Sequence, residues 1–415
     1  MRKFHDGRDW FFEKRFGLFV HWGLYALTGW HEQMEWRGRM PRREYDKLID
    51  RFNPVHFDPE QWLDDMQEAG MEYLCFTTKH HDGFCMFDTQ YTDFNIMHTP
   101  YKKDIVGMLS EACRKRNIPF GIYYSIPDWH HKNYPNAYRH HEMFGPRPTD
   151  EPDEDLYFEY VRNQMRELLT NYGEISQVFW DINVLEHYDP SFNEMIRRLQ
   201  PNCVINDRGP DAGDFSTPER HVPDGFSFKR PTEAVQSLGR ESWGYKTDED
   251  YYSCKYLMRS IDKILAMGGN YKLNVGPMPD GRWSEKDRAI LKKLGSWYGR
   301  CKEAFGDAQP ATTMLVQSPN YANPRDDVLL TRRGNDIYVH ACNDLQTSAI
   351  ILRPLIQQPV RATLLNNGQE LETGVDLVPF FWREKPYLRI RGLPVDTLSD
   401  EVLVVKLEFG DEYCM

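Results

Sequence analysis

Two adjacent histidines directly follow an apolar run of this sequence and are its most informative feature. Residues 73–78 are β-formers, and Lys79-His80-His81-Asp82 comes next. Burying two imidazoles, an ammonium and a carboxylate in an apolar core would carry a large desolvation penalty. We therefore expect these groups at a polar site where a strand ends, which is where α/β barrels place their catalytic groups. A solvated loop with two hydrogen-bonded histidines is the alternative interpretation.

Polar and aromatic side chains stand at the ends of four further apolar runs. They are His21, with Glu35-Trp36 in the loop that follows, then Tyr123, Asp181 and Arg208. Because the carboxyl ends of parallel strands meet at one face of a barrel, these successive strand ends predict a lined pocket. Imidazole, guanidinium and phenol groups hydrogen-bond to hydroxyls, and aromatic rings offer flat apolar faces. The combination is typical of a pocket for a sugar.

Asp181 is the strongest candidate for a catalytic carboxylate. It closes the apolar, aromatic run 177–180, so we expect its side chain at the mouth of the pocket, with a helix N-cap as the alternative. Cleavage of a glycosidic bond requires a second carboxyl group. Glu219 is a candidate, but spacing alone does not distinguish it from other loop acids. Those acids are Asp211, Asp214 and Glu241.

Motifs for metal binding and for other nucleophiles are weaker. Residues 31–35 resemble the zinc motif HExxH but end in Glu35, and their surroundings are typical of a loop, so we expect no zinc site. The pairs His130-His131 and His140-His141 lie in an inserted loop, where solvated histidines are expected. The sequence contains neither a GxSxG elbow nor a phosphate-binding loop.

These side chains need a framework that brings the strand ends together. Strand-like runs alternate with helical runs, which predicts a parallel sheet. A (β/α)8-type barrel fits better than a doubly wound sheet, because no GxGxxG turn follows the first strand. The predicted strands are 17–22, 73–78, 120–125, 177–181, 204–206 and 272–275. The predicted helices are 58–69, 105–116, 156–171 and 256–267, and residues 134–155 are interpreted as a loop inserted after the third strand.

The predicted secondary structure changes near residue 311, from alternating strands and helices to strands alone. Short runs of β-formers, separated by turn signals such as Asn366-Asn367-Gly368, predict an all-β sandwich. The predicted strands are 328–331, 337–341, 348–352, 361–365, 387–390 and 402–407. We therefore predict an α/β fold with a catalytic barrel over residues 1–308 and a C-terminal β-sandwich over residues 309–415.

The net charge and the cysteine pattern of the chain bear on its binding partners and its cellular compartment. A formal charge of −12 and a pI near 5.7 argue against nucleic acid and anionic membranes. The 8 cysteines include no CxxC pair, so a reducing, cytoplasmic compartment is the simpler expectation. The sequence shows no transmembrane run and no apolar signal core, although a leader removed from the protein would leave the same sequence.

Several motifs together resemble the family-29 glycoside hydrolases, the α-L-fucosidases. The resemblance runs from about residue 10 to about residue 305, and its FxHWG and KHHDGF elements are specific to that group. It implies a retaining exo-glycosidase without a metal ion or an organic cofactor. The matching motifs are Phe16–Gly23, Glu35-Trp36, Thr78–Phe84, Asn206–Arg208, Ser242–Tyr245 and Leu273–Pro277.

The resemblance also implies roles for individual residues. Asp181 corresponds to the nucleophile of the family, and Glu219, in a segment resembling GDxxTPE, corresponds to the acid/base of many members. His21, Glu35, His80, His81, Tyr123 and Arg208 match positions that bind the hydroxyls and ring oxygen of fucose. Trp243 and Phe19 match aromatic positions near the methyl group, and Trp36 and Phe179 complete the predicted substrate-binding set.

The sequence departs from the family pattern next to the nucleophile. Phe179 stands where a tryptophan is usual, and Ile182 follows Asp181 where a glycine is common. A retaining site places its two carboxyl groups ~5–5.5 Å apart. It also needs an ionised Asp181, helped by Arg208 or by hydrogen bonds, and a protonated Glu219.

We therefore predict an exo-acting α-L-fucosidase that uses a double displacement. Its partner would be a fucosylated oligosaccharide or glycoconjugate, and a homo-oligomer is left open. One alternative is a hydrolase of a related sugar such as an α-L-galactoside. Another is a non-catalytic carbohydrate-binding relative, which would need neither Asp181 nor Glu219 at those positions.

Overall fold

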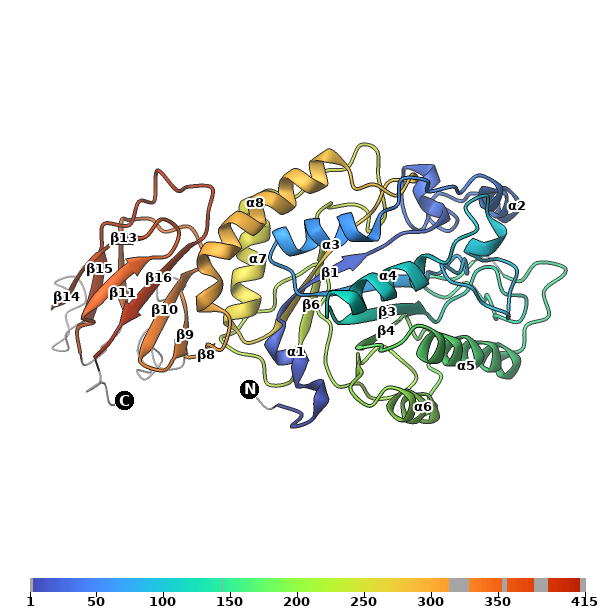
Figure 1. Cartoon of the computed structure of the whole chain (residues 1–415), viewed down its shortest axis with the longest axis horizontal. Coiled ribbons are helices and arrows are strands. Elements are labelled where there is room, and N and C mark those ends of the chain that lie inside the picture. The colour runs from blue at the N-terminus through green and yellow to red at the C-terminus, as the bar shows by residue number, and fades with distance from the viewer. Residues whose placement is uncertain (1–2, 144, 313–327, 353–356, 377–386, 411–415) are drawn as a thin grey trace.

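A curled, seven-stranded parallel sheet forms the larger part of the molecule, with the strand order β5-β4-β3-β2-β1-β7-β6 (Figure 1). The structure is a computed structural model and describes residues 3–143, 145–312, 328–352, 357–376 and 387–410. The strands are β1 (Phe16–Val20), β2 (Tyr73–Lys79), β3 (Phe120–Ser125), β4 (Gln177–Asp181), β5 (Val204–Ile205), β6 (Glu233–Ser237) and β7 (Asn270–Val275). Nearly all of their residues are buried, as expected for a parallel sheet covered by helices outside and filled by side chains inside.

An irregular segment fills the gap between the two edge strands. Phe215 forms an isolated parallel bridge with Asn206, beside β5, and Glu219 forms one with Val235 in β6. Residues 215–219 thus take the place of an eighth strand and complete the barrel. Pro218 has no N–H to donate, which is one reason why this segment forms no regular ladder. The segment brings Glu219 to the ring of strands.

The longer helices cover the outer face of the barrel, and two short helices lie in the segments before and after β1 (Figure 1). They are α1 (Trp10–Glu13), α2 (Arg42–Tyr45), α3 (Pro59–Glu68), α4 (Ile105–Lys115), α5 (Glu154–Asn171), α6 (Ser191–Leu199), α7 (Cys254–Ala266) and α8 (Glu285–Cys301). Short 3-10 turns lie at Gly7–Asp9, Leu24–Thr28, Asp46–Asp50, Ile96–His98 and Lys302–Ala304. Several helices begin at a side-chain cap. Asp58 accepts from the backbone N–H groups of Glu60 and Gln61, and Ser284 forms a capping box with Asp287.

The expected barrel architecture is confirmed, and each predicted strand and helix lies within two residues of its observed bounds. In the barrel, strand β6 and helices α1, α2, α6 and α8 were not predicted. The run Glu233-Ala234-Val235-Gln236-Ser237 looks too polar for a buried strand, yet the whole strand is buried. Its acidic side chain is neutralised inside the barrel, where Glu233 lies 2.8 Å from Nζ of Lys272.

Two antiparallel sheets form the C-terminal region, as predicted. One has the order β13-β12-β16-β10-β9-β8 and the other the order β11-β15-β14. Leu330, Ile350, Leu364, Leu388 and Val405 belong to one core shared by the two sheets. The strands are β8 (Gln309–Pro310), β9 (Leu329–Arg333), β10 (Asp336–Ala341), β11 (Ala349–Leu352), β12 (Arg361–Leu364), β13 (Gln369–Glu370), β14 (Glu372–Asp376), β15 (Tyr387–Arg391) and β16 (Leu403–Glu408).

The C-terminal sheets lie beside α7 and α8 of the barrel (Figure 1). Trp297 of α8 donates its indole N–H to the carbonyl of Val402 at 2.9 Å. His340 and Asp262 form a fully buried pair, with 2.8 Å between Nδ1 and Oδ1. Specific polar contacts therefore fix the sandwich to the barrel.

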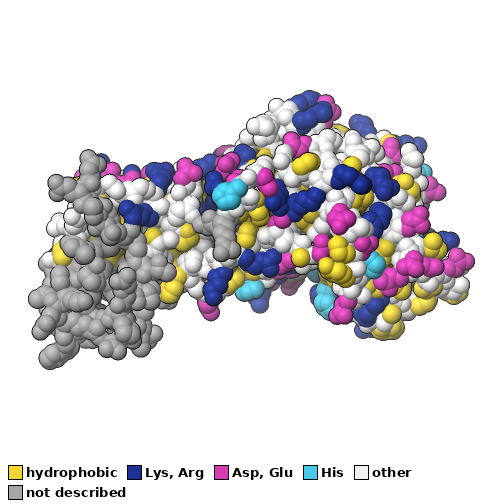
Figure 2. Space-filling model, turned by 90° about the horizontal axis from the view of Figure 1, so that it is seen from below, with side chains coloured by type: hydrophobic (Ala, Val, Ile, Leu, Met, Phe, Trp, Pro, Cys, Tyr) yellow, Lys and Arg dark blue, Asp and Glu magenta, His cyan; other side chains and the backbone are white. Residues whose placement is uncertain are grey.

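The surface carries charges of both signs. Acidic and basic side chains are interspersed over the barrel on the face shown in Figure 2. Among the helices of the described residues, none combines the length and apolar character needed to cross a membrane.

Candidate active site

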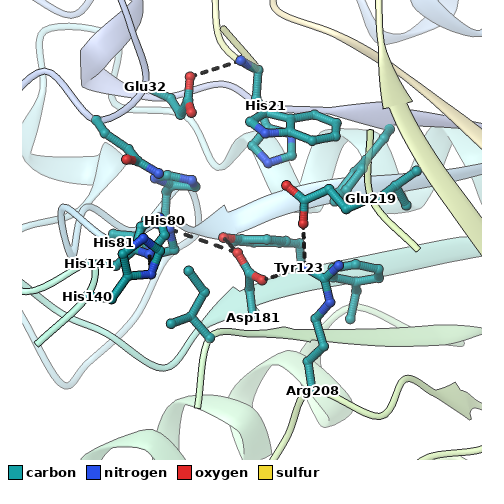
Figure 3. Close-up of a pocket in the computed structure, with 16 residues that line it drawn as sticks. His21, Glu32, His80, His81, Tyr123, His140, His141, Asp181, Arg208 and Glu219 are labelled. Atoms are coloured by element: carbon teal, nitrogen blue, oxygen red, sulfur yellow. Dashed lines mark hydrogen bonds and ion pairs between the residues drawn. The ribbon is translucent and has the colours of Figure 1, made fainter. Parts of the chain in front are cut away.

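A cavity of about 280 Å³ is lined by residues at the carboxyl ends of the barrel strands and in the loops that follow them (Figure 3). Most of the residues predicted for the site line this one cavity. They are Phe19, His21, His80, His81, Tyr123, Phe179, Asp181, Arg208, Glu219 and Trp243. The structure therefore brings together side chains from β1, β3 and β4 and from the loops after β1, β2, β5 and β6.

Asp181 is the last residue of β4, and both of its carboxylate oxygens are hydrogen-bonded. The Tyr123 hydroxyl donates to Oδ2 at 2.7 Å, and Nη1 of Arg208 donates to Oδ1 at 3.1 Å. Burial alone would raise the pKa of Asp181. The Arg208 guanidinium, His81 and the Tyr123 hydroxyl outweigh burial and hold this pKa below its ordinary value. Asp181 is thus an ionised carboxylate at neutral pH.

Arg208 also binds the second candidate carboxylate. Its Nη1 donates to Oε2 of Glu219 at 2.8 Å, so that one nitrogen contacts Asp181 and Glu219 together. Two oxygens within hydrogen-bond distance of one nitrogen are no more than about 6 Å apart. Figure 3 shows the two carboxylates converging on the same cavity. Arg208 is itself held by Thr217, whose hydroxyl and carbonyl accept from Nε at 2.7 Å and Nη2 at 2.8 Å.

His21 presents a hydrogen-bond acceptor to the cavity. Its Nδ1 lies 2.6 Å from Oδ1 of Asn274, which is an acceptor, so Nδ1 carries the proton and Nε2 does not. Burial lowers the pKa of His21 to about 4, so the ring is neutral at neutral pH. Asn274 also donates to the carbonyl of Trp243 at 2.6 Å, and the indole of Trp243 stacks on His21. One asparagine of β7 thus positions both rings.

His81 is oriented in the same way. The Ser125 hydroxyl donates to the carbonyl of Pro127, so it accepts from Nδ1 of His81 at 2.6 Å. The Nε2 of His81 is therefore an acceptor, 3.9 Å from Oδ2 of Asp181. Burial lowers the pKa of His81 to about 4. Burial lowers the pKa of the neighbouring His80 as well, and its ring stacks on Tyr123.

The inner wall of the cavity is aromatic. Phe19 and Phe179 form a small buried cluster with Tyr123, and the partly buried Trp243 packs against it. Lys272 supports this cluster from inside the barrel, with Nζ 4.4 Å from the ring centroid of Phe19 and 4.2 Å from that of Phe179. Trp180 lies outside this cluster and packs against Phe192 of α6. The alternation of β4 thus places Phe179 and Asp181 in the pocket.

Glu35 and Trp36 do not line the cavity. Glu35 is buried, and burial raises its pKa to about 8. The positive charge of Arg42 opposes this rise, whereas the negative charges of Asp82 and Asp46 add to it. Within the described part of the chain, no group donates a hydrogen bond to Oε1 of Glu35. Trp36 stacks on His141 at 5.0 Å and so supports the wall from behind. Their predicted contact with substrate stays a prediction.

Glu32 lines the cavity although the sequence did not single it out. Its Oε2 accepts from the Ser242 hydroxyl at 2.8 Å and from the backbone N–H of Trp243 at 2.9 Å. Burial opposes the ionisation of Glu32. His31, His21 and the Ser242 hydroxyl outweigh burial and keep the pKa of Glu32 below its ordinary value. The anion thereby fixes the loop that carries Trp243.

Besides Glu32 and Gln33, four further residues that were not predicted from the sequence line the pocket. They are His140, His141, Ile182 and Val235. The expectation that His140 and His141 are solvated is wrong for His141, which is 9% exposed. The indole N–H of Trp129 donates to the His141 carbonyl at 2.8 Å and fixes its loop against the barrel. The adjacent pair His140-His141 repeats the pattern of His80-His81, and this likeness could have predicted a place in the pocket.

No group of three or more histidine, cysteine, aspartate or glutamate side chains in the described ranges is arranged to hold a metal ion. Cysteines 75, 85, 113, 203, 254, 301 and 342 are free thiols.

Comparisons of the sequence and the structure with known proteins identify the family of this chain. The sequence profile named Alpha-L-fucosidase matches residues 2–303. Human tissue alpha-L-fucosidase is 25% identical over 420 residues, which cover 93% of this chain and 87% of the human protein. Among solved structures, alpha-L-fucosidase isoenzyme 1 from Paenibacillus thiaminolyticus is 30% identical, with a TM-score of 0.85 and coverage of 98% of this chain and 100% of the other.

A second solved structure is similar over almost the same length. The alpha-fucosidase of Thermotoga maritima, in complex with a mechanism-based inhibitor, is 26% identical, with a TM-score of 0.73 and coverage of 96% of both chains. The profile match spans most of the barrel, and the Paenibacillus structure matches nearly the whole chain. The chain belongs to the α-L-fucosidase family of glycoside hydrolases.

Proposed function

We propose that Asp181 is the nucleophile and Glu219 the general acid/base of this enzyme. The protein is a retaining α-L-fucosidase. One observation carries the pairing of these two acids in one catalytic site: both carboxylates accept a hydrogen bond from Nη1 of Arg208. The two bonded oxygens, Oδ1 of Asp181 and Oε2 of Glu219, are therefore no more than about 6 Å apart, which is compatible with the ~5–5.5 Å between the carboxyl groups of retaining glycosidases.

In the first step, an oxygen of Asp181 attacks the anomeric carbon while the bond to the leaving oxygen breaks. Glu219 gives its proton to that oxygen, so the leaving group departs as a neutral alcohol. In the second step, Glu219 takes a proton from water, the water oxygen attacks the anomeric carbon, and Asp181 is released. Asp181 is suited to the first role because Arg208 and Tyr123 keep it ionised.

The buried part of the pocket would hold the terminal sugar. His21 and His81 each present an unprotonated Nε2, which can accept a hydrogen bond from a sugar hydroxyl. Phe19 and Trp243 supply apolar surface for the methyl group. A fucosyl unit at the end of an oligosaccharide or glycoconjugate is the substrate that this enclosed pocket accommodates.

The stereochemistry of azide rescue tests the two roles separately. In Asp181→Asn, azide should displace the leaving group once and give the inverted β-L-fucosyl azide. In Glu219→Gln, a reactive substrate should still form the glycosyl-enzyme, and azide should then give the retained α-L-fucosyl azide. Glu241→Gln changes another loop acid, which does not line the pocket, and should keep wild-type kinetics. Hydrolysis at the wild-type rate by Asp181→Asn would exclude the proposed nucleophile.

A further inference from the structure

Arg220, the residue after the proposed acid/base, has an unfavourable backbone conformation. Its φ is +53°, in the left-handed region that residues with a Cβ atom rarely adopt. Its Nη2 is buried, and no acceptor for it is found among the described residues. Buried polar groups without a partner are rare, and strained backbone persists where the surrounding structure imposes it. These two features, one residue away from Glu219, indicate a role for the side chain of Arg220.

The guanidinium of Arg220 ties the segment that carries Glu219 to the loop after β6. Its Nη1 donates to the carbonyls of Arg240 at 2.8 Å and Gly239 at 3.3 Å. Its Cζ lies 4.4 Å from the ring centroid of Trp243, where a cation is attracted to the face of an indole. These contacts, the Arg220 clamp, therefore hold both the backbone of that loop and the indole that lines the cavity.

The loop that receives the clamp is itself fixed by hydrogen bonds. Glu249 accepts from the backbone N–H of Ser242 at 3.1 Å. The backbone N–H of Trp243 donates to Glu32 at 2.9 Å, and the carbonyl of Trp243 accepts from Asn274 at 2.6 Å. The clamp thus attaches the acid/base segment to a part of the site that several strands and loops hold in place.

Glu219 needs such an anchor because its segment is irregular and lies near the surface. The backbone N–H of Val235 donates to the carbonyl of Pro218 at 2.9 Å, and the backbone N–H of Arg220 donates to the carbonyl of Val235 at 3.0 Å. The chain then enters residues 221–230, most of which are exposed. The side chain of Glu219 is itself 39% exposed. The turn of the chain at Arg220 therefore bears on where the Glu219 carboxyl group lies.

We propose that Arg220 is a positioning residue for general-acid catalysis, because its clamp holds the carboxyl group of Glu219 where it can give its proton to the leaving oxygen. The inference rests on the function proposed above. A misplaced general acid slows those reactions in which the leaving oxygen needs a proton. The effect of losing the clamp therefore depends on the leaving group, whereas a general loss of structure would slow every substrate alike.

Two aryl α-L-fucosides measure this dependence through kcat/KM, which reports the step that breaks the glycosidic bond. The phenyl fucoside has a basic leaving oxygen that needs the proton, whereas the 2-chloro-4-nitrophenyl fucoside leaves as a stable phenolate. Arg220→Asn removes the guanidinium and tolerates the left-handed region. We expect its kcat/KM on the phenyl fucoside to fall roughly 10- to 100-fold, the scale of a misplaced catalytic group. On the chloronitrophenyl fucoside, kcat/KM should stay within about threefold of wild type.

Arg240→Asn is the matched control, with the same change of residue type and net charge. Arg240 takes part in the clamp through its backbone carbonyl, and it is exposed and does not line the cavity. This variant should keep kcat/KM within about twofold of wild type on both substrates. Arg220→Lys keeps a cation on a long stem but lacks the planar fork. It should show the same preference with a smaller loss, and it provides the test if Arg220→Asn folds poorly.

Glu219→Gln, measured in parallel, tests the premise of the experiment. It should show the same preference for the chloronitrophenyl fucoside, with a larger loss on the phenyl fucoside. If Glu219→Gln shows this preference and the Arg220 variants lose equally on both substrates, or lose nothing on the phenyl fucoside, the positioning role of Arg220 is overturned. If Glu219→Gln itself loses equally on both substrates, the acid/base assignment fails instead.

Discussion

Asp181 and Glu219 are joined through a single atom, because Nη1 of Arg208 donates to a carboxylate oxygen of each, at 3.1 and 2.8 Å. The two acids come from different parts of the barrel, one from the end of β4 and the other from the irregular segment that bridges β5 and β6. The guanidinium therefore sets their spacing. It also keeps the pKa of Asp181 low.

Arg208→Lys should impair the enzyme strongly, because an ammonium cannot reproduce the planar fork that binds Asp181, Glu219 and Thr217 together. We expect kcat/KM to fall roughly 10²–10³-fold, the scale of losing a preorganised charged donor. The pKa of Asp181 should rise, so the acid limb of the pH profile should move to higher pH. Arg230→Lys alters an exposed ion pair with Asp207 and is the control, expected to keep wild-type activity.

Tyr123→Phe removes one hydrogen bond to Asp181 and leaves the ring in place. Because hydrogen bonds to charged groups contribute about 1.5–3 kcal/mol, we expect kcat/KM to fall roughly 10- to 100-fold. Tyr45→Phe removes a similar buried bond, from its hydroxyl to Asp82 at 2.6 Å, away from the cavity. Steady-state kinetics should show a loss for Tyr123→Phe only. Equal kinetics for the two variants would argue against a role for the Tyr123 hydroxyl.

The pH dependence of kcat/KM should reflect neutral histidines. His21 and His81 have pKa values lowered by burial to about 4, and both must be unprotonated to accept hydrogen bonds at Nε2. Activity should therefore persist from neutral pH down to about pH 5 and fall near pH 4. An acid limb between pH 6 and 7, the range of an ordinary histidine, would contradict this assignment.

The acid-limb measurement needs a test of folding at each pH. The unfolded chain protonates these histidines at higher pH than the folded one does, so the free energy of unfolding also falls as the pH drops below about 6.5. Circular dichroism at each pH distinguishes loss of structure from loss of activity.

Glu35 should make the stability of the protein depend on pH. Its pKa is raised by burial to about 8, so between about pH 4.5 and pH 8 the folded protein holds a proton that the unfolded chain releases. The free energy of unfolding therefore falls as the pH rises through this window. Glu35→Gln is neutral at every pH, so its stability relative to wild type should increase with pH, by up to ~1.4 kcal/mol per unit.

Urea unfolding at pH 5 and pH 8 measures this difference. The exposed Glu241→Gln is the control and should show no such trend. The same stability difference between Glu35→Gln and wild type at both pH values would mean that Glu35 is ionised in the folded protein.

The parts of the site that regular strands carry could be predicted from the sequence. His21, His80, Tyr123 and Asp181 follow or close apolar runs, and the carboxyl ends of parallel strands meet at one face. Hydrophobic runs and helix caps likewise located most of the barrel elements.

The remaining parts depend on contacts between segments that are distant in the sequence. Strand β6 was missed because its sequence is polar, and the group that neutralises Glu233, the ammonium of Lys272, comes from another strand. Spacing did not single out Glu219, because its position depends on bridges to β6. His141 lies in the pocket through contacts of its loop with distant residues, among them Trp129 and Trp36. The backbone strain at Arg220 is a property of the folded loop.

Trapping of the glycosyl-enzyme tests the central claim most directly. The protein would be treated with 2-deoxy-2-fluoro-α-L-fucosyl fluoride, digested, and analysed by mass spectrometry for the peptide that carries the sugar. We predict a single fluorofucosyl group on Asp181, with no labelling in Asp181→Asn. A label on any other residue, in an enzyme that hydrolyses α-L-fucosides, would contradict the account.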